Sequence, residues 1–181
     1  GNDTLIGGDG VDTLMGGAGD DRFFIDDDGD TMVGGDGKDR FYLTSVADLA
    51  NGLTLSGDGT SVGSTGQDRL VVQLSETGEA QTVDLTASNV QIAGIDRIDI
   101  GADVSGLTIT LNHALASTAD NNQDDSYGDI RINSRVYVEN ETEIGLTASP
   151  IINGIIVDGR GLESSDSLFF DGEVHVGLND A

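Results

Sequence analysis

Aspartate recurs at every ninth position near the start of the chain. The five aspartates in this phase are Asp3, Asp12, Asp21, Asp30 and Asp39. A large apolar residue stands two positions after each of them, which gives Leu5, Leu14, Phe23, Met32 and Phe41. A flexible acidic linker would suit the composition, but it has no reason to keep apolar residues in phase with aspartates. The period therefore predicts stacked structural units in residues 1–42.

The repeated unit reads G-G-x-G-x-D-x-U-x, where U is a large apolar residue, and it is clearest in residues 7–15, 16–24 and 34–42. Glycine accepts backbone angles that other residues resist, so the glycine-rich part can turn tightly and aim its carbonyl oxygens at one point. The three residues after each aspartate are extended, and strand alternation turns only the apolar one inward. Each unit thus supplies one core residue and one loop of oxygen atoms.

The oxygen atoms of such a loop suit calcium. Ca²⁺ takes six to eight oxygen ligands at about 2.3–2.6 Å, and carbonyl and carboxylate groups supply them. The chain also carries 33 acidic residues against 8 basic ones, a formal charge of −25, which repels itself in any compact state. We therefore expect the metal-free chain to be loose or unfolded, and calcium binding to supply folding free energy.

The repeats resemble the RTX nonapeptide family, whose members form a parallel β-roll with two nonapeptides per turn. The resemblance implies that calcium lies between one loop and the loop two repeats later. Loops that end at Asp3, Asp21 and Asp39 would then stack on one side, and those that end at Asp12 and Asp30 on the other. A weaker copy, out of phase by two residues, lies at 63–71. The predicted ligands are Asp3, Gly7, Asp9, Asp12, Gly16, Gly17, Ala18, Gly19, Asp21, Asp28, Asp30, Gly34, Gly35, Asp36, Gly37, Asp39 and Asp68.

The fourth unit, residues 25–33, departs from the pattern. It keeps Asp30 and Met32 but places Asp26 and Asp28 where the family has glycine. Aspartate tolerates left-handed backbone angles better than most residues, so the loop could survive under strain. Because the glycines are lost, we expect the side of the roll with this loop to bind calcium less well than the opposite side.

Position nine of each unit is apolar too, and strand alternation points it outward. Phe24 and Tyr42 hold this position on one face. One reading is a mildly apolar position that faces solvent. The other is that residues beyond 80 cover this face, in which case Phe24 and Tyr42 should both be buried.

Beyond about residue 80 the glycines thin out and strand patterns follow. Residues 107–111 alternate between apolar residues and threonine, and the segments 151–157 and 167–170 are apolar runs compatible with buried strands. We predict an all-β fold. A parallel β-roll, that is, a calcium-binding β-solenoid, would occupy residues 1–79, and a β-rich extension in 80–181 would continue or cap it.

Other segments give weaker signals. Residues 43–62 read as irregular, with a turn at 56–60, whereas 70–74 and 135–139 read as strands. A short helix is conceivable at 113–119.

A second type of metal site is suggested by Asp120, Asn122 and Asp124, which have the spacing of the first three ligands of an EF-hand loop. Asp125 replaces the glycine of the sharp turn, and Arg131 stands where the bidentate glutamate belongs. A solvated polar loop is the alternative interpretation.

Several classes of protein do not fit. One lysine and seven arginines, scattered along the sequence, argue against nucleic-acid binding. No apolar run is long enough for a membrane-spanning helix. Cysteine is absent, and His113 and His175 lack a zinc-type spacing, so disulfides, thiolate chemistry and zinc catalysis are not indicated. We expect no enzymatic activity.

The favoured function is a calcium-dependent folding and structural module of a secreted RTX protein. The chain begins in mid-repeat, and residues 81–112 look like the spacers of very large adhesin-like proteins, so we expect a piece of one such protein. The resemblance implies type I secretion and an extracellular or cell-surface location. The alternative is a calcium-dependent module that binds a carbohydrate, either an extracellular polysaccharide or a cell surface, although tryptophan is absent and aromatics make up only 4%. An enzyme with a pocket in residues 80–181 is the third possibility.

Overall fold

A computed structural model describes residues 1–26, 28–58, 68–74, 81–101, 107–112, 129–133, 156–161 and 167–171. Within these residues the secondary structure is almost entirely β-strand, and the strand pairs are parallel. The one helix described there is the short 3-10 helix η1 (Val46–Leu49). None of the described helices is long and apolar enough to cross a membrane.

One sheet of seven strands, the long sheet, runs through the whole described chain. Its order is β1 (Thr4–Ile6), β3 (Arg22–Phe24), β5 (Arg40–Leu43), β7 (Arg69–Val72), β10 (Arg97–Ile100), β12 (Asp129–Asn133) and β14 (Ser167–Asp171). It crosses the domain boundary predicted between residues 79 and 80 without a break in strand pairing. The division into two domains stays a prediction, while the later strands continue the same stack.

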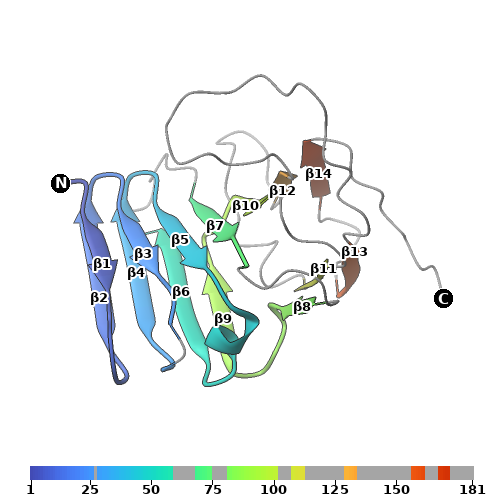
Figure 1. The fold of residues 1–181 in the computed structure, drawn as a ribbon. Coiled ribbons are helices and arrows are strands. Elements are labelled where there is room, and N and C mark those ends of the chain that lie inside the picture. Colours follow the sequence, from blue (N-terminus) through green and yellow to red (C-terminus); the bar gives the residue numbers. More distant parts are fainter. Residues whose placement is uncertain are drawn as a thin grey trace.

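Two smaller sheets hold the alternate strands. The first contains β2 (Thr13–Ala18), β4 (Thr31–Asp36), β6 (Leu53–Asp58) and β9 (Val90–Ala93). The second contains β13 (Ile156–Gly161), β11 (Leu107–Asn112) and β8 (Gln81–Asp84) in that order. In the first coils the chain moves from the long sheet to the smaller one and back, so two short strands complete each turn (Figure 1). The predicted parallel β-roll is confirmed.

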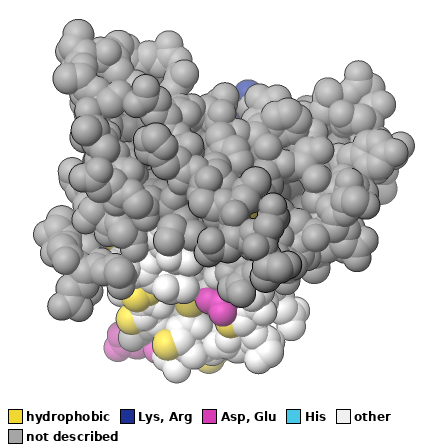
Figure 2. All heavy atoms as spheres, turned by 90° about the vertical axis from the view of Figure 1, so that its right-hand side faces the viewer, with side chains coloured by type: hydrophobic (Ala, Val, Ile, Leu, Met, Phe, Trp, Pro, Cys, Tyr) yellow, Lys and Arg dark blue, Asp and Glu magenta, His cyan; other side chains and the backbone are white. Residues whose placement is uncertain are grey.

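Acidic and hydrophobic side chains lie side by side on the described surface (Figure 2). Seen from the end of the stack opposite β1, the described part of the surface carries hydrophobic side chains beside acidic ones (Figure 2). Lysine and arginine side chains hardly show on the described surface in this view.

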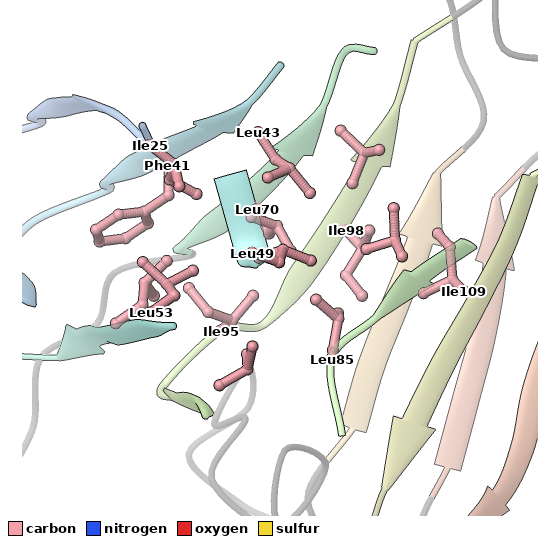
Figure 3. Close-up of a cluster of buried hydrophobic side chains, with 14 of the residues drawn as sticks. Ile25, Phe41, Leu43, Leu49, Leu53, Leu70, Leu85, Ile95, Ile98 and Ile109 are labelled. Carbon is pink, nitrogen blue, oxygen red and sulfur yellow. The ribbon is translucent and has the colours of Figure 1, made fainter. Parts of the chain in front are cut away.

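The core lies between the sheets and is one residue thick per strand. Phe23, Met32 and Phe41 are completely buried, as the repeat predicts, and the rings of Phe23 and Phe41 stack with centroids 4.8 Å apart. Leu5 and Leu14, in the first coil, are partly buried and pack against this core. Further along, the column of inward side chains continues through Leu70, Ile98 and Ile109, among others (Figure 3).

The prediction that residues 43–62 are irregular is wrong. They contain η1, whose capping box is formed by Ser45 and Asp48, and the strand β6, which buries Leu53 and Leu55. The turn predicted at 56–60 is wrong for Ser56–Asp58, which are the end of β6. Here the roll gains a coil without the glycine-rich motif, because alternating leucines alone suffice to face the core.

Most of the other predicted strands are confirmed where the structure describes them. The strands β7, β11 and β14 lie at the expected places, and β13 begins at Ile156. The predicted strand at 135–139 and the conceivable helix at 113–119 fall outside the described residues.

The position-nine residues give an intermediate result. Phe24 and Tyr42 are half-buried, and their rings stack on the outer face of the long sheet with centroids 5.0 Å apart. Val71, next in the same column, is buried. Whether residues beyond 80 cover this face therefore stays a prediction.

Candidate calcium sites

A ladder of aspartates runs along one edge of the long sheet. Each carboxylate accepts a hydrogen bond, at 2.7–2.9 Å, from the backbone nitrogen of the aspartate one coil earlier. The members are Asp3, Asp21, Asp39, Asp68 and Asp96, and all except Asp3 are buried. Isolated buried carboxylates are unfavourable, so a column of them requires positive charge nearby.

The second oxygen of these carboxylates lies against the glycine loops. A Cβ atom at Gly16 would collide with Asp21 Oδ2 and would lie 2.7 Å from the carbonyl oxygen of Gly34. A Cβ atom at Gly34 would likewise collide with Asp39 Oδ2 and lie 2.6 Å from the carbonyl oxygen of Gly57. At each level, therefore, a carboxylate of one coil and a carbonyl of the next coil converge on a space that only glycine leaves open.

The same arrangement continues beyond the repeats. A Cβ atom at Gly57 would lie 2.7 Å from Asp68 Oδ2 and would collide with the carbonyl oxygen of Gly94. The ladder also continues here, because the Asp96 carboxylate accepts a 2.9 Å hydrogen bond from the Asp68 backbone nitrogen. Neither Gly57, Gly94 nor Asp96 is a predicted ligand, because no nonapeptide surrounds them.

The ladder aspartates share a second sequence feature, which also holds outside the nonapeptide repeats. Each buried ladder aspartate is followed directly by arginine, at 21–22, 39–40, 68–69 and 96–97. The backbone nitrogen of that arginine donates to the carbonyl oxygen of the ladder aspartate one coil earlier, at 2.9–3.2 Å. The Asp-Arg pair could have pointed to the fourth level where the glycine pattern is absent.

The loops between ladder aspartates stack tightly through glycine. Gly35 and Gly37 adopt φ angles of 112° and 143°, and a Cβ atom at either position would collide with the backbone of Gly17 or Gly19 one coil earlier. The predicted residues Ala18 and Asp36 take part through their carbonyl oxygens, which accept hydrogen bonds from Gly1 at 2.5 Å and Gly19 at 2.8 Å. The Asp36 side chain is exposed, as is that of Asp9.

On the opposite side of the roll the same arrangement of carboxylate and glycine occurs once, between the loops that end at Asp12 and Asp30. Asp30 Oδ1 accepts a hydrogen bond from the Asp12 nitrogen at 2.8 Å. A Cβ atom at Gly7 would collide with Asp30 Oδ2 and would lie 3.2 Å from Asp12 Oδ2. The predicted separation of the loops into an Asp3/Asp21/Asp39 side and an Asp12/Asp30 side is therefore what the structure contains.

The two aspartates that replace glycine on this side act as hydrogen-bond acceptors. Asp26 Oδ2 accepts from the Gly8 nitrogen at 3.2 Å, and Asp28 Oδ2 accepts from the Gly10 nitrogen at 2.9 Å. Burial, followed by the charge of Asp30, raises the pKa of the Asp26 carboxyl above its ordinary value. The side chains of Asp26 and Asp28 therefore link this loop to the preceding coil by hydrogen bonds. The same arrangement brings the negative charges of Asp26 and Asp30 close together.

The donor set fits calcium. Asp21 Oδ2 and Asp30 Oδ2 are buried and accept no hydrogen bond from the described residues, which is costly for an anionic oxygen. Within the described part of the chain no three acidic, histidine or cysteine side chains converge, whereas carbonyl oxygens of the glycine loops lie close to the carboxylates. Carbonyls with one or two carboxylates are typical of Ca²⁺, and this oxygen-only set contains no soft ligand.

The third predicted cluster is not placed. Asp120, Asn122 and Asp124, proposed as EF-hand-like ligands, fall outside the described residues, and so do His113 and His175.

Comparison with known proteins identifies the repeats. The family model of the RTX calcium-binding nonapeptide repeat, which describes four copies, matches residues 1–23 and again residues 24–44. Searches of curated proteins and of solved structures return no significant match. Residues 1–44 are therefore RTX calcium-binding repeats, and they form the first coils of a parallel β-roll.

Proposed function

We propose that the chain is a non-catalytic structural module that folds when its loops bind calcium, and that it belongs to a secreted protein. The observation that carries this proposal is the buried aspartate ladder, in which Asp21 Oδ2 is held inside the roll without a hydrogen-bond donor among the described residues. A divalent cation at this place would turn an unfavourable buried charge into a link between two coils.

The ligands follow from the convergence of oxygens. On the ladder side we assign them to the carboxylates of Asp21, Asp39 and Asp68 together with carbonyl oxygens of the glycine loops 16–19 and 34–37. On the other side we assign Asp12 and Asp30. A bound calcium ion would supply positive charge to these carboxylates, and the glycines leave room for it.

Calcium would then control folding as well as stability. The core is thin, and the formal charge of −25 opposes a compact state. A ligand that binds only the folded chain stabilises it in proportion to the logarithm of its concentration. The module would stay unfolded where calcium is scarce, pass through a type I secretion channel, and fold outside the cell as part of an adhesin-like protein.

A calcium titration followed by circular dichroism tests this function. In chelator we expect little regular structure, and on adding calcium a cooperative gain of β signal. Magnesium should not substitute, because it demands near-ideal octahedral geometry and loses its water reluctantly. A chain that keeps the full β signal and the same melting temperature after exhaustive removal of calcium would refute the proposal.

A further inference from the structure

One asparagine–glycine pair lies in a tight turn of the roll. Asn51 and Gly52 join η1 to β6, and Asn51 is exposed. Gly52 is buried with a φ angle of 103°, and a Cβ atom there would lie 2.9 Å from the carbonyl oxygen of Asn89. Glycine suits both this left-handed backbone and this close approach. The fold therefore places glycine directly after an exposed asparagine.

The backbone nitrogen of Gly52 is held by a long hydrogen bond. It donates to the carbonyl oxygen of Leu49 at 3.3 Å, whereas N–H···O bonds in proteins usually measure about 2.7–3.2 Å. The same carbonyl oxygen accepts a second hydrogen bond, at 3.2 Å, from Asn89 Nδ2, which also donates to the carbonyl oxygen of Ala50 at 3.1 Å. Asn89, one coil later, thus secures the turn, while the Gly52 nitrogen keeps a weak partner.

We propose that Asn51 is a site of spontaneous deamidation in the folded chain, a covalent modification that needs no reagent other than water. The Gly52 nitrogen attacks the side-chain carbonyl carbon of Asn51, the new N–C bond closes a five-membered succinimide ring, and the Cγ–Nδ2 bond breaks. The amide group leaves as ammonia with the proton of the Gly52 nitrogen. Water then opens the ring at either carbonyl, which gives aspartate or isoaspartate at position 51. No group is oxidised or reduced.

Asn89 shows why the residue after the asparagine decides the site. Asn89 is also exposed and also ends a turn directly before a strand, β9. The nitrogen that follows it, of Val90, donates a shorter 2.9 Å hydrogen bond to the carbonyl oxygen of Ala87. A β-branched side chain hinders attack by its own backbone nitrogen, whereas glycine has no side chain to obstruct it. The second asparagine–glycine pair in the sequence, at 153–154, falls outside the described residues.

Both products should weaken the coil that β6 completes. Isoaspartate routes the main chain through Cβ and Cγ, which inserts an extra atom shortly before Leu53, a core residue that pairs with Val90 of β9. Aspartate adds a negative charge beside the degraded loop 25–33, since a Cβ atom at Gly29 would lie 2.9 Å from the Asn51 carbonyl oxygen. That loop is already rich in aspartate. Deamidation should therefore raise the calcium concentration that folding requires, a link that rests on the proposed calcium-dependent folding.

Ageing the purified chain at neutral pH, once in saturating calcium and once in chelator, tests the proposal. Peptide mapping by mass spectrometry follows Asn51 and Asn89, and a synthetic peptide of residues 47–55 gives the rate without a fold. In calcium, Asn51 should convert while Asn89 stays intact. Chelator should speed the conversion of Asn51 by about three- to tenfold, the factor expected when the attacking nitrogen loses one net hydrogen bond. Asn89→Ala, which loosens the turn, should move the rate in calcium toward the rate in chelator.

Calcium titrations of fresh and aged chains, followed by circular dichroism, measure the consequence. Ageing should raise the calcium midpoint of the unmodified chain more than that of the matched control Asn51→Gln, which ages at every other site and whose longer side chain closes the ring slowly. Asn51 that stays intact in calcium while the peptide converts, or that converts no faster than Asn89, would overturn the proposal. Equal shifts in the unmodified and Asn51→Gln chains would overturn its link to folding. A fresh chain that does not respond to calcium would instead count against the proposed function.

Discussion

The backbone nitrogen of Asp39 donates a 2.7 Å hydrogen bond to the carboxylate of Asp68, although 29 residues separate them. Within the repeats the same bond joins residues 18 apart, as between Asp21 and Asp39. The extra residues are therefore accommodated without interrupting the ladder. Calcium dependence should accordingly extend past residue 44, where the family match ends.

Replacing Asp68 tests this extension. Asp68→Ala should raise the calcium concentration at the folding midpoint and lower the free energy of unfolding by about 1.5–3 kcal/mol, the cost of a hydrogen bond to a charged group. Asp36→Ala, at an exposed side chain, is the matched control and should change the unfolding free energy by less than about 0.5 kcal/mol. Circular dichroism at fixed calcium measures both, and equal midpoints for the two variants would contradict the extension.

The two sides of the roll should differ in calcium dependence. Asp21→Ala should shift the calcium midpoint more than Asp30→Ala, because Asp21 belongs to a ladder that spans several coils. The loop before Asp30 is also held by the backbone nitrogens of Gly8 and Gly10, which donate hydrogen bonds to the carboxylates of Asp26 and Asp28. Parallel calcium titrations of both variants measure the difference. Indistinguishable midpoints would argue that the two sides bind calcium alike.

Restoring glycine to the degraded loop should have opposite effects at high and low calcium. Asp26→Gly with Asp28→Gly removes two negative charges and recovers the loop chemistry of the repeat, so thermal stability in saturating calcium should rise. The same change deletes the acceptors of the Gly8 and Gly10 nitrogens, so more calcium should be needed before folding begins. Melting curves over a range of calcium concentrations test this: the variant should melt above the unmodified chain at high calcium and below it at low calcium. A melting temperature that shifts in the same direction at every calcium concentration would refute the prediction.

Alanine substitutions at Gly8 and Gly35 can distinguish the cost of backbone strain from the cost of a steric collision. Gly35 and Gly8 both have positive φ, 112° and 84°, but a Cβ atom at Gly35 would collide with the carbonyl oxygen of Gly17, whereas at Gly8 it would meet nothing within 4 Å. Gly8→Ala should therefore cost about 1–2 kcal/mol, the penalty for an L-residue in this region, and Gly35→Ala clearly more. Urea unfolding in saturating calcium provides the comparison, and equal costs would mean that the coils can move apart.

The sequence was sufficient to predict the repeat region, because there a single period serves both the loop and the core. Phe23, Met32 and Phe41 are in phase with the aspartates, so one pattern predicts the buried column and the side of each loop. The β6 strand was missed because its leucines face the core without any glycine motif.

The contacts of Gly57, Gly94 and Asp96 beside Asp68 were missed for a related reason. They come together only through stacking, across segments of unequal length that no fixed spacing records. The alignment of Arg22, Arg40, Arg69 and Arg97 at one register position of the long sheet was hidden in the same way, since they stand at irregular intervals in the sequence. Each of these four directly follows a ladder aspartate, and this shared offset brings them into register.

The continuous long sheet has a mechanical consequence. Since each coil touches chiefly the coils above and below it, a force applied along the axis would peel off one layer at a time instead of breaking a single interior. Every detached layer would expose metal-binding loops to solvent and release their ions. The force that the roll withstands would then depend on the calcium concentration of the surrounding water.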